Sequence, residues 1–293
     1  MMAQIDGHTI LIGLMATPIR HSMSPTMHNN VFAKLGLNYA YLAFEVGNDR
    51  LEKAIEAIRT LDMRGSNISM PNKQKVIPYL DQLDKSAQLC DAVNTIVNDD
   101  GKLTGYTTDG IGFMKSLTDE GLDIRGKKMT LVGAGGAGTP IAIQAALDGV
   151  KEIALFNRDD SQWAQAEKNV KTINQETDCH ATLHHLENQT ELKEAIAASD
   201  IYVDATGCGM KPLEDVAVVN DPSWFHQDMI VFDTVYAPRE TKLMRIAKQG
   251  GVKHVFNGLG MMLEQGAAAF KLWTGKDMPV AYIRQLLFND AQA

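Results

Sequence analysis

Cysteines are few in this sequence, and it lacks both a long apolar run and a cluster of basic residues. The three cysteines, Cys90, Cys179 and Cys208, are scattered and show no C-x-x-C spacing, which fits a reduced, cytoplasmic setting. No apolar run approaches the roughly 20 residues that a membrane span needs. The run from Ile10 to Ala16 is short and follows Asp6, so it predicts a buried strand rather than a signal peptide.

The overall composition points to a folded protein with acidic character. A net charge of −8 without a basic cluster argues against nucleic acid as a partner. A hydrophobic content of 45% is enough to build real cores and too high for a disordered chain. With 293 residues, the chain has the length of two domains, or of one domain interrupted by another.

A glycine-rich turn lies between two apolar runs in the middle of the chain. The segment reads in order as a strand, a turn, a helix, a second strand and an acidic end: Met129 to Val132, Gly133 to Gly138, Thr139 to Leu147, Ile153 to Phe156, and Asn157 to Asp160. The turn, Gly-Ala-Gly-Gly-Ala-Gly, matches G-x-G-x-x-G. A glycine turn alone is weak evidence, but the complete unit predicts dinucleotide binding.

Each part of this unit has a physical purpose. Gly133 permits the tight turn out of the strand, Gly135 lets the backbone approach a pyrophosphate, and Gly138 lets the helix pack close to the strand. The amino terminus of the helix then offers N–H groups and a partial positive charge to phosphates. Pro140 is compatible with this helix because it lies in the first turn.

The acidic end bears on the choice of cofactor. Asp159 or Asp160 can hydrogen-bond a ribose 2′-hydroxyl and would repel a 2′-phosphate, which favours NAD. Arg158 points the other way, because a guanidinium can bind a 2′-phosphate. We therefore expect NAD, with NADP as a possible second cofactor.

Strands and helices alternate along the rest of the chain, which predicts an α/β protein with a parallel, doubly wound sheet in its second half. Ser24 and Pro25 are expected at the N-cap and first position of an early helix. Val76 to Leu83 is expected to form a short helix. Asp100-Gly101 predicts the turn of a hairpin.

A polar segment after residue 178 carries Cys179, His180, His184 and His185. This spacing raises the question of a metal site. A solvated loop is the preferred interpretation, because a zinc site needs four convergent ligands and the segment is otherwise polar. We therefore predict no metal.

The chain resembles the shikimate/quinate dehydrogenase family along nearly its whole length. Six motifs occur in the family's order: Arg20 to Asn29 (RHSMSPTMHN), Asn67 to Lys73 (NISMPNK), Ala92 to Thr95 (AVNT), Gly105 to Gly110 (GYTTDG), the glycine turn, and Gly258 to Gly266 (GLGMMLEQG). The Pro-Asn-Lys variant and the Asn-Arg-Asp-Asp end look closer to the branch that uses NAD readily on quinate and shikimate.

The resemblance implies reversible oxidation of one ring hydroxyl of shikimate, or of quinate, to a ketone, with hydride passing to a nicotinamide. It assigns proton transfer to Lys73, assisted by Asp109. A lysine is a poor base near neutral pH unless a closed cleft disfavours its charged form. Asp109 can hold the substrate hydroxyl and orient the amine. Without the motif, Lys73 would pass for a surface lysine and Asp109 for a helix N-cap.

Further residues match the family's ligand contacts. Ser22 and Ser24 match its carboxylate binders, and hydroxyls near a helix start suit an anion. Four more side chains match contacts to ring hydroxyls, for which groups that both donate and accept are suited: Tyr41, Ser69, Asn94 and Gln265.

The cofactor contacts are expected mainly from the glycine turn and the acidic end. The full predicted set is Gly133, Ala134, Gly135, Gly136, Ala137, Asn157, Arg158, Asp160, Val235 and Gly258. One departure from the family pattern concerns Asp204, which stands in Asp204-Ala205-Thr206 where asparagine is common. No basic residue follows at Gly207 or Cys208.

The resemblance implies two domains with a cleft between them. Residues 1–109 and 258–293 are expected to bind substrate, and residues 110–257 to form a Rossmann-type NAD(P)-binding domain. We expect a cytoplasmic enzyme of aromatic amino acid biosynthesis, possibly a homodimer. Two alternatives remain: an enzyme of similar layout such as a methylenetetrahydrofolate dehydrogenase, and a nucleotide-binding sensor without catalysis. The paired serines and Gln265 argue against the first, and the presence of both Lys73 and Asp109 against the second.

Overall fold

The computed structural model describes residues 5–288, and the chain divides into two compact units. The first unit combines the chain up to Thr108 with the chain from Leu263 onward, and the second unit is Asp109–Met262. The domain limits expected from the sequence lie within a few residues of these. The roles expected for the two domains stay predictions at this point.

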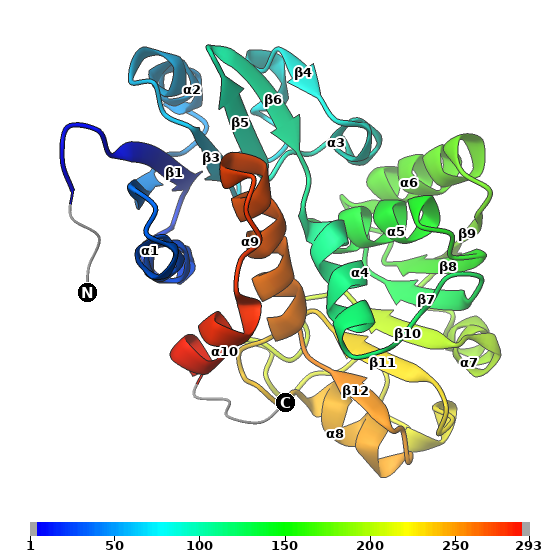
Figure 1. Ribbon diagram of the computed structural model, residues 1–293. Helices are drawn as coiled ribbons and strands as arrows, with labels where there is room; N and C mark the ends of the chain where they lie inside the picture. Colours follow the sequence, from blue (N-terminus) through cyan, green and yellow to red (C-terminus); the bar gives the residue numbers. More distant parts are fainter. Residues whose placement is uncertain (1–4, 289–293) are drawn as a thin grey trace. The chain divides into compact units, whose positions relative to one another are not determined.

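The second unit is built on a six-stranded sheet in which every neighbouring pair of strands is parallel (Figure 1). Its strands are β7 (Lys128–Val132), β8 (Glu152–Asn157), β9 (His180–His185), β10 (Ile201–Asp204), β11 (Ile230–Asp233) and β12 (His254–Phe256). The spatial order is β12-β11-β10-β7-β8-β9. This is the 3-2-1-4-5-6 order of dinucleotide-binding sheets, so the predicted doubly wound fold is confirmed.

Helices cover both faces of this sheet. They are α4 (Asp109–Asp119), α5 (Gly138–Leu147), α6 (Trp163–Glu176), α7 (Gln189–Ala198), the short 3₁₀ helix η2 (Pro222–Trp224) and α8 (Lys242–Gln249). Phe113 of α4 packs edge-to-face on Phe232 of β11, with ring centroids 5.0 Å apart. Tyr202 and Val231 point to the opposite face, where they form a core with Leu243 of α8. Side chains alternate between faces along each strand, so Asp204 and Asp233 share the face of Tyr202 and Val231.

The first unit contains a mixed six-stranded sheet in the order β2-β1-β3-β5-β6-β4. Its strands are β1 (Ile10–Ala16), β2 (Tyr39–Glu45), β3 (Gly65–Ile68), β4 (Gln82–Leu83), β5 (Thr95–Asp99) and β6 (Lys102–Tyr106). Its helices are α1 (Ser24–Leu35), α2 (Leu51–Thr60), the 3₁₀ helix η1 (Ile77–Tyr79), α3 (Lys85–Cys90), α10 (Val280–Phe288) and most of α9 (Leu259–Thr274). β5 and β6 form the expected hairpin, and both Asp100 and Gly101 have positive φ.

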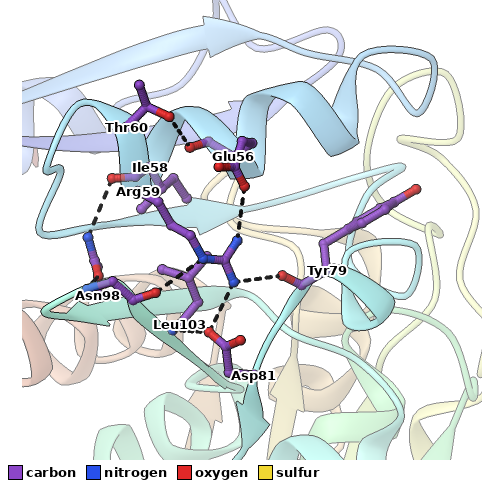
Figure 2. A network of polar contacts seen from close by, with 9 residues as sticks. Glu56, Ile58, Arg59, Thr60, Tyr79, Asp81, Asn98 and Leu103 are labelled. Atoms are coloured by element: carbon purple, nitrogen blue, oxygen red, sulfur yellow. Dashed lines mark hydrogen bonds and ion pairs between the residues drawn. The ribbon is translucent and has the colours of Figure 1, made fainter.

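One core of the first unit is formed by residues of its sheet and of α2. A charged network around Arg59 links α2 to neighbouring segments. Arg59 of α2 donates to the Tyr79 carbonyl oxygen and to Asp81 Oδ2, as Figure 2 shows. It also donates to the Gly101 carbonyl oxygen. The same Asp81 oxygen accepts from the Leu103 amide at 2.7 Å. The guanidinium therefore fastens α2 to η1 and to the hairpin.

A cluster of aromatic rings forms a second part of the first unit's interior. His28 of α1 stacks on Tyr41 of β2 and on Phe270 of α9, and Trp273 meets its edge. Trp273 Nε1 also donates to the Ile96 carbonyl oxygen at 2.9 Å. His28 is completely buried, and neither of its ring nitrogens has a hydrogen-bond partner in the described part of the chain. Burial lowers the pKa of His28 to about 3, so the ring is neutral.

Three local expectations were wrong, and one further helix was not predicted. Residues 76–83 do not form one helix, because only Ile77–Tyr79 is helical, as η1, and the chain then enters β4. The helix α3 that follows was missed, although Asp84 caps it by accepting from the Ala87 and Ser86 amides. At α1, Met23 rather than Ser24 occupies the N-cap, and no side chain caps the helix.

The third error concerns the segment His180–His185, which is the edge strand β9 and not a loop. Its histidines have structural partners. His184 stacks on Phe156 and contacts Thr182 and Glu191, and His185 stacks on Trp163 with centroids 4.1 Å apart.

Candidate active site

The glycine turn connects β7 to α5 at the carboxyl edge of the second unit's sheet. Gly133 has a backbone φ of 97°, which residues other than glycine rarely adopt. A Cβ at Gly138 would overlap the Gly133 carbonyl oxygen. By contrast, a Cβ at Gly135 or Gly136 would have no heavy atom within 4 Å, so this side of the turn is open. An open backbone at the amino end of α5 fits a pyrophosphate.

Asn157 at the end of β8 supports the turn. Its Oδ1 accepts from the Ala134 amide at 3.0 Å, and its Nδ2 donates to the Arg158 carbonyl oxygen. Thr139 adds a second support, because its hydroxyl donates to the Ala134 carbonyl oxygen and accepts from Asn169 Nδ2. Asn157 and Ala134 are buried and hold the shape of the turn, while Gly136 is exposed at its tip and Ala137 is half-buried.

The acidic end after β8 is exposed and charged with both signs. Arg158 Nε lies 3.6 Å from Asp160 Oδ2, and Asp160 Oδ1 accepts from the Gln162 amide at 2.9 Å. The Arg158 side chain is 73% exposed. A ribose at this edge would therefore meet a carboxylate and a guanidinium together. The arrangement suits a 2′-hydroxyl, and it leaves Arg158 available for a 2′-phosphate.

Val235 and Gly258, both predicted to contact the cofactor, are adjacent in the structure. The Gly258 amide donates to the Val235 carbonyl oxygen at 3.0 Å, and the Val235 amide donates to Asp233 Oδ1. A Cβ at Gly258 would overlap the Thr234 carbonyl oxygen. Glycine is therefore required at this position for packing of the backbone, whatever else it contacts.

In the first unit, two of the predicted substrate residues, Ser69 and Asn94, lie where β3 ends and β5 begins, next to the end of β1. The Ser69 amide donates to the Met15 carbonyl oxygen, and the Ile68 amide donates to that of Asn94. Ser22 and Ser24 stand at the start of α1, where Ser22 Oγ accepts from the Ser24 amide at 3.2 Å. Ser22, Ser24, Ser69 and Lys73 are half-buried. Hydroxyls and an amine of this kind can hold a hydroxylated carboxylic acid.

A buried polar network connects Tyr41 through Asn67 and Asn94 to Thr108. The Tyr41 hydroxyl donates to Asn67 Oδ1, and Asn67 Nδ2 donates to Thr95 Oγ1. The Thr95 hydroxyl donates in turn to Asn94 Oδ1, which also accepts from the Thr108 amide. Asn94 Nδ2 donates to Thr108 Oγ1 at 2.9 Å. The network thus joins β2, β3 and β5 to the residue that precedes Asp109.

This network changes how two predicted substrate contacts are understood. Tyr41 is fully buried, burial raises the pKa of its hydroxyl, and a hydrogen bond with Ser24 opposes that shift. Asn94 uses both ends of its amide within the protein. Sequence reasoning gave Asn67, Thr95 and Thr108 no role. Asn67 could have been noticed, because an amide within a short, buried strand needs partners.

The two predicted catalytic residues and Gln265 occupy well-defined places in the chain. Lys73 follows β3 and its carbonyl oxygen accepts from the Val93 amide. Asp109 is half-buried and is the first residue of α4, so it lies within the first turn of the helix and not at the N-cap position before it. Gln265 is half-buried on α9. Their contacts with a substrate stay predictions.

Within residues 5–288, no group of three or more His, Cys, Asp or Glu side chains is placed to hold a metal ion. Over the same range, no helix combines the length and apolarity that crossing a membrane requires.

Comparisons with protein families match both ends of the chain. A family described as the shikimate dehydrogenase substrate binding domain matches residues 14–96. A second, described as the shikimate 5′-dehydrogenase C-terminal domain, matches residues 258–288.

Individual proteins match over nearly the full length. A shikimate dehydrogenase (NADP(+)) from Streptococcus uberis is 58% identical over 292 residues, which cover 99% of each chain. The solved structure of shikimate 5-dehydrogenase from Listeria monocytogenes, in complex with shikimate and NAD, has a TM-score of 0.96 and 55% identity, and covers 98% of this chain and 99% of its own. A quinate dehydrogenase from Corynebacterium glutamicum, in complex with NAD, has a TM-score of 0.85 at 28% identity, and covers 96% and 99% of the two chains.

Proposed function

Because the chain belongs to the shikimate dehydrogenase family, we propose that it oxidises the ring hydroxyl of shikimate to 3-dehydroshikimate, reversibly, with NAD or NADP. The protein is an oxidoreductase that acts on a CH–OH group. The strongest support is the 58% identity to a shikimate dehydrogenase across 99% of both chains. Quinate is a second, weaker candidate substrate, since a quinate dehydrogenase matches at only 28% identity.

The second unit has the features that a nicotinamide dinucleotide requires. The pyrophosphate is assigned to the open side of the turn at Gly135 and Gly136 and to the amino end of α5. The ribose is assigned to the exposed end of β8, near Asp160 and Arg158. The bound cofactor supplies a nicotinamide ring that accepts hydride from the substrate carbon. Val235 and Gly258 are assigned to the neighbourhood of this ring.

The residues that the sequence predicts to bind substrate or to move its proton are assigned to the substrate. Ser22 and Ser24 bind the carboxylate, while Ser69, Asn94 and Gln265 hold ring hydroxyls. The hydride goes to the nicotinamide, so the proton of the reacting hydroxyl needs a separate acceptor, and Lys73 takes it. Asp109 holds that hydroxyl and orients the lysine amine. Tyr41 and Asn67 hold Asn94 in place, because the Tyr41 hydroxyl donates to Asn67 and the Asn67 amide donates to the Asn94 carbonyl oxygen.

We also propose that NAD is used at least as readily as NADP. The support is Asp160, whose carboxylate is fixed by the Gln162 amide at the edge where the ribose is assigned. Arg158 is placed to accept NADP as well. The predicted cytoplasmic location and homodimer are part of this proposal.

Initial rates test these proposals together. Shikimate and quinate are each assayed with NAD and with NADP, and we expect the highest turnover with shikimate. Turnover of neither acid with either cofactor, in a protein that binds NADH, would overturn the proposed reaction and favour the folate enzyme or the sensor. Asp160→Ala should move the preference toward NADP, and Arg158→Ala should move it toward NAD. An unchanged ratio in both variants would refute the role of the acidic end.

A further inference from the structure

Two buried carboxyl groups, those of Asp204 and Asp233, lie side by side at the carboxyl edge of the second unit's sheet. They end the neighbouring parallel strands β10 and β11 and are direct partners in the strand register. Only 2% of Asp204 and 1% of Asp233 is exposed. Both side chains point to the face covered by α8, so the two carboxyls are brought together by the sheet itself.

Each carboxyl group holds the loop that follows its strand. Asp204 Oδ1 accepts from both the amide and the hydroxyl of Thr206, whose Oγ1 accepts in turn from the Cys208 amide. Asp233 Oδ1 accepts from the Val235 amide, and its Oδ2 accepts from the Thr241 hydroxyl at 2.6 Å. Residues 205–209 and 234–241 are thus anchored on this carboxyl pair.

Titratable groups around the pair are acidic. Tyr202 lies two residues before Asp204 on the same face of β10, and Cys208 lies in the loop after it. Burial raises the pKa of the Tyr202 hydroxyl, and both carboxylates and the Cys208 thiol raise it further. From α8 the pair receives the Thr241 hydroxyl at the helix cap. The contacts that favour ionisation are therefore hydroxyls and backbone amides.

Burial and the neighbouring Asp204 carboxylate raise the pKa of Asp233 to about 7. Burial also raises the pKa of Asp204, against the pull of the Thr206 hydrogen bonds. Two adjacent carboxylates in a buried site cannot both ionise without a large cost, so the pair titrates as one unit.

We propose that Asp204 and Asp233 share one proton and act as positioning residues for the two loops on the nicotinamide side of the cofactor site. A second negative charge forces one carboxyl to turn toward water, which breaks its bonds to its loop. Ionisation of the pair then weakens cofactor binding. The link to the cofactor rests on the proposed function, whereas the shared proton does not.

The effect on stability has a definite sign. A carboxyl group whose pKa is higher in the folded state retains its proton where the unfolded chain has lost it. The pair's contribution to stability is complete below about pH 4 and is lost as the pH rises through about 7. Stability that falls over this range is the behaviour opposite to that of an ion-paired aspartate.

The experiment compares the unsubstituted protein with Asp204→Asn, which keeps the size and one acceptor oxygen but cannot ionise. Urea unfolding and direct NADH titration are each followed from pH 5 to pH 9; NADH is chosen because it carries no 2′-phosphate that would titrate in this range. We expect the Kd for NADH to rise by roughly tenfold across pH 7 in the unsubstituted protein and by less than about twofold in Asp204→Asn. The stability of Asp204→Asn should also fall less steeply as the pH rises toward 7, because burial alone then raises the pKa of Asp233.

Asp200→Asn is the matched control. Asp200 precedes the other end of β10 and accepts from the Lys128 amide, but it is only half-buried and lies at the opposite end of the strand from the pair. This control should keep the pH dependence of the unsubstituted protein. If Asp204→Asn does not fold, Asp233→Asn serves in its place.

The outcomes separate the two proposals. Identical pH profiles in the unsubstituted protein and the Asp204→Asn variant, in both assays, would overturn the shared proton. A flattened stability curve with unchanged NADH profiles would overturn the role in cofactor binding. Failure to bind NADH at any pH would count against the proposed function, while the urea curves would still test the carboxyl pair.

Discussion

Tyr41 donates its phenolic hydrogen to Asn67 Oδ1 over 2.6 Å, and the bond crosses β1, which lies between the strands of the two residues. Asn67 in turn donates to Thr95 Oγ1 and to the Asn94 carbonyl oxygen. A side chain assigned from sequence to the substrate therefore occupies a structural position. A Tyr41 variant tests whether this residue also contacts substrate, if substrate binding and the stability of the fold are measured separately.

Tyr41→Phe removes the hydroxyl and keeps the ring stacked on His28. We expect the free energy of unfolding to fall by about 1–2 kcal/mol, because Asn67 Oδ1 loses its buried donor. We expect the KM for shikimate to change by less than about threefold, since the hydroxyl is already used within the protein. Urea unfolding and steady-state rates measure the two effects.

Tyr39→Phe is the control, since Tyr39 is only half-buried at the start of the same strand. A tenfold rise in KM for Tyr41→Phe without loss of stability would restore Tyr41 to the substrate site.

The strand that carries Tyr41 could be predicted from sequence, but the partner of its hydroxyl could not. Alternation of side chains along a strand indicates which face a residue occupies, and not which residue of another strand it meets. Asn67 lies 26 residues further along the chain and two strands across the sheet. Networks of this kind depend on sheet order, which local sequence does not encode.

The second half of the chain was easier to predict because its elements are local and strongly patterned. The glycine turn, α5 and β8 follow one another without interruption, and each leaves a sequence signal. The edge strand β9 was missed because its sequence, HATLHH, is polar at the positions that face solvent or aromatic rings. An edge strand needs less apolar surface than a central strand, so the amino-acid composition of an edge strand can resemble that of a loop.

Lys73→Ala should reduce kcat for shikimate oxidation by roughly 10²–10⁴-fold, because the reacting hydroxyl loses its proton acceptor. We expect the KM for shikimate to change far less. The control is Lys75→Ala, since Lys75 lies two residues further on and is exposed. Full turnover by Lys73→Ala would remove this lysine from the proposed chemistry.

The glycine turn allows a test with two neighbouring glycines. At Gly138 a Cβ would overlap the Gly133 carbonyl oxygen, so Gly138→Ala should lower the free energy of unfolding by at least about 2 kcal/mol. At Gly135 a Cβ has open space, so Gly135→Ala should fold normally. Its methyl group would stand where the pyrophosphate approaches, and we expect the Kd for NADH to rise by roughly tenfold or more.

Urea unfolding and NADH titration distinguish the two variants. Unchanged NADH affinity in a well-folded Gly135→Ala protein would place the pyrophosphate elsewhere.

His28 makes acid stability a further test of the fold. Its ring is buried among Tyr41, Phe270 and Trp273, and burial lowers its pKa from 6.5 to about 3. In the unfolded chain His28 binds a proton below pH 6.5, whereas in the folded chain it binds one only below about pH 3. The stability conferred by the neutral ring is present above pH 6.5 and is lost as the pH falls.

Between pH 7 and pH 5 this single residue should lower the free energy of unfolding by about 2 kcal/mol. His28→Phe keeps an aromatic ring in the cluster but cannot bind a proton, so its stability should depend less on pH by that amount. The slope between pH 5 and pH 7 is the quantity to compare, because the larger ring can shift stability equally at every pH. His21→Phe, at an exposed position in the same motif, should keep the original slope. Equal slopes in His28→Phe and the unsubstituted protein would mean that His28 accepts a proton within the fold, and that the aromatic cluster opens to water more readily than its burial implies.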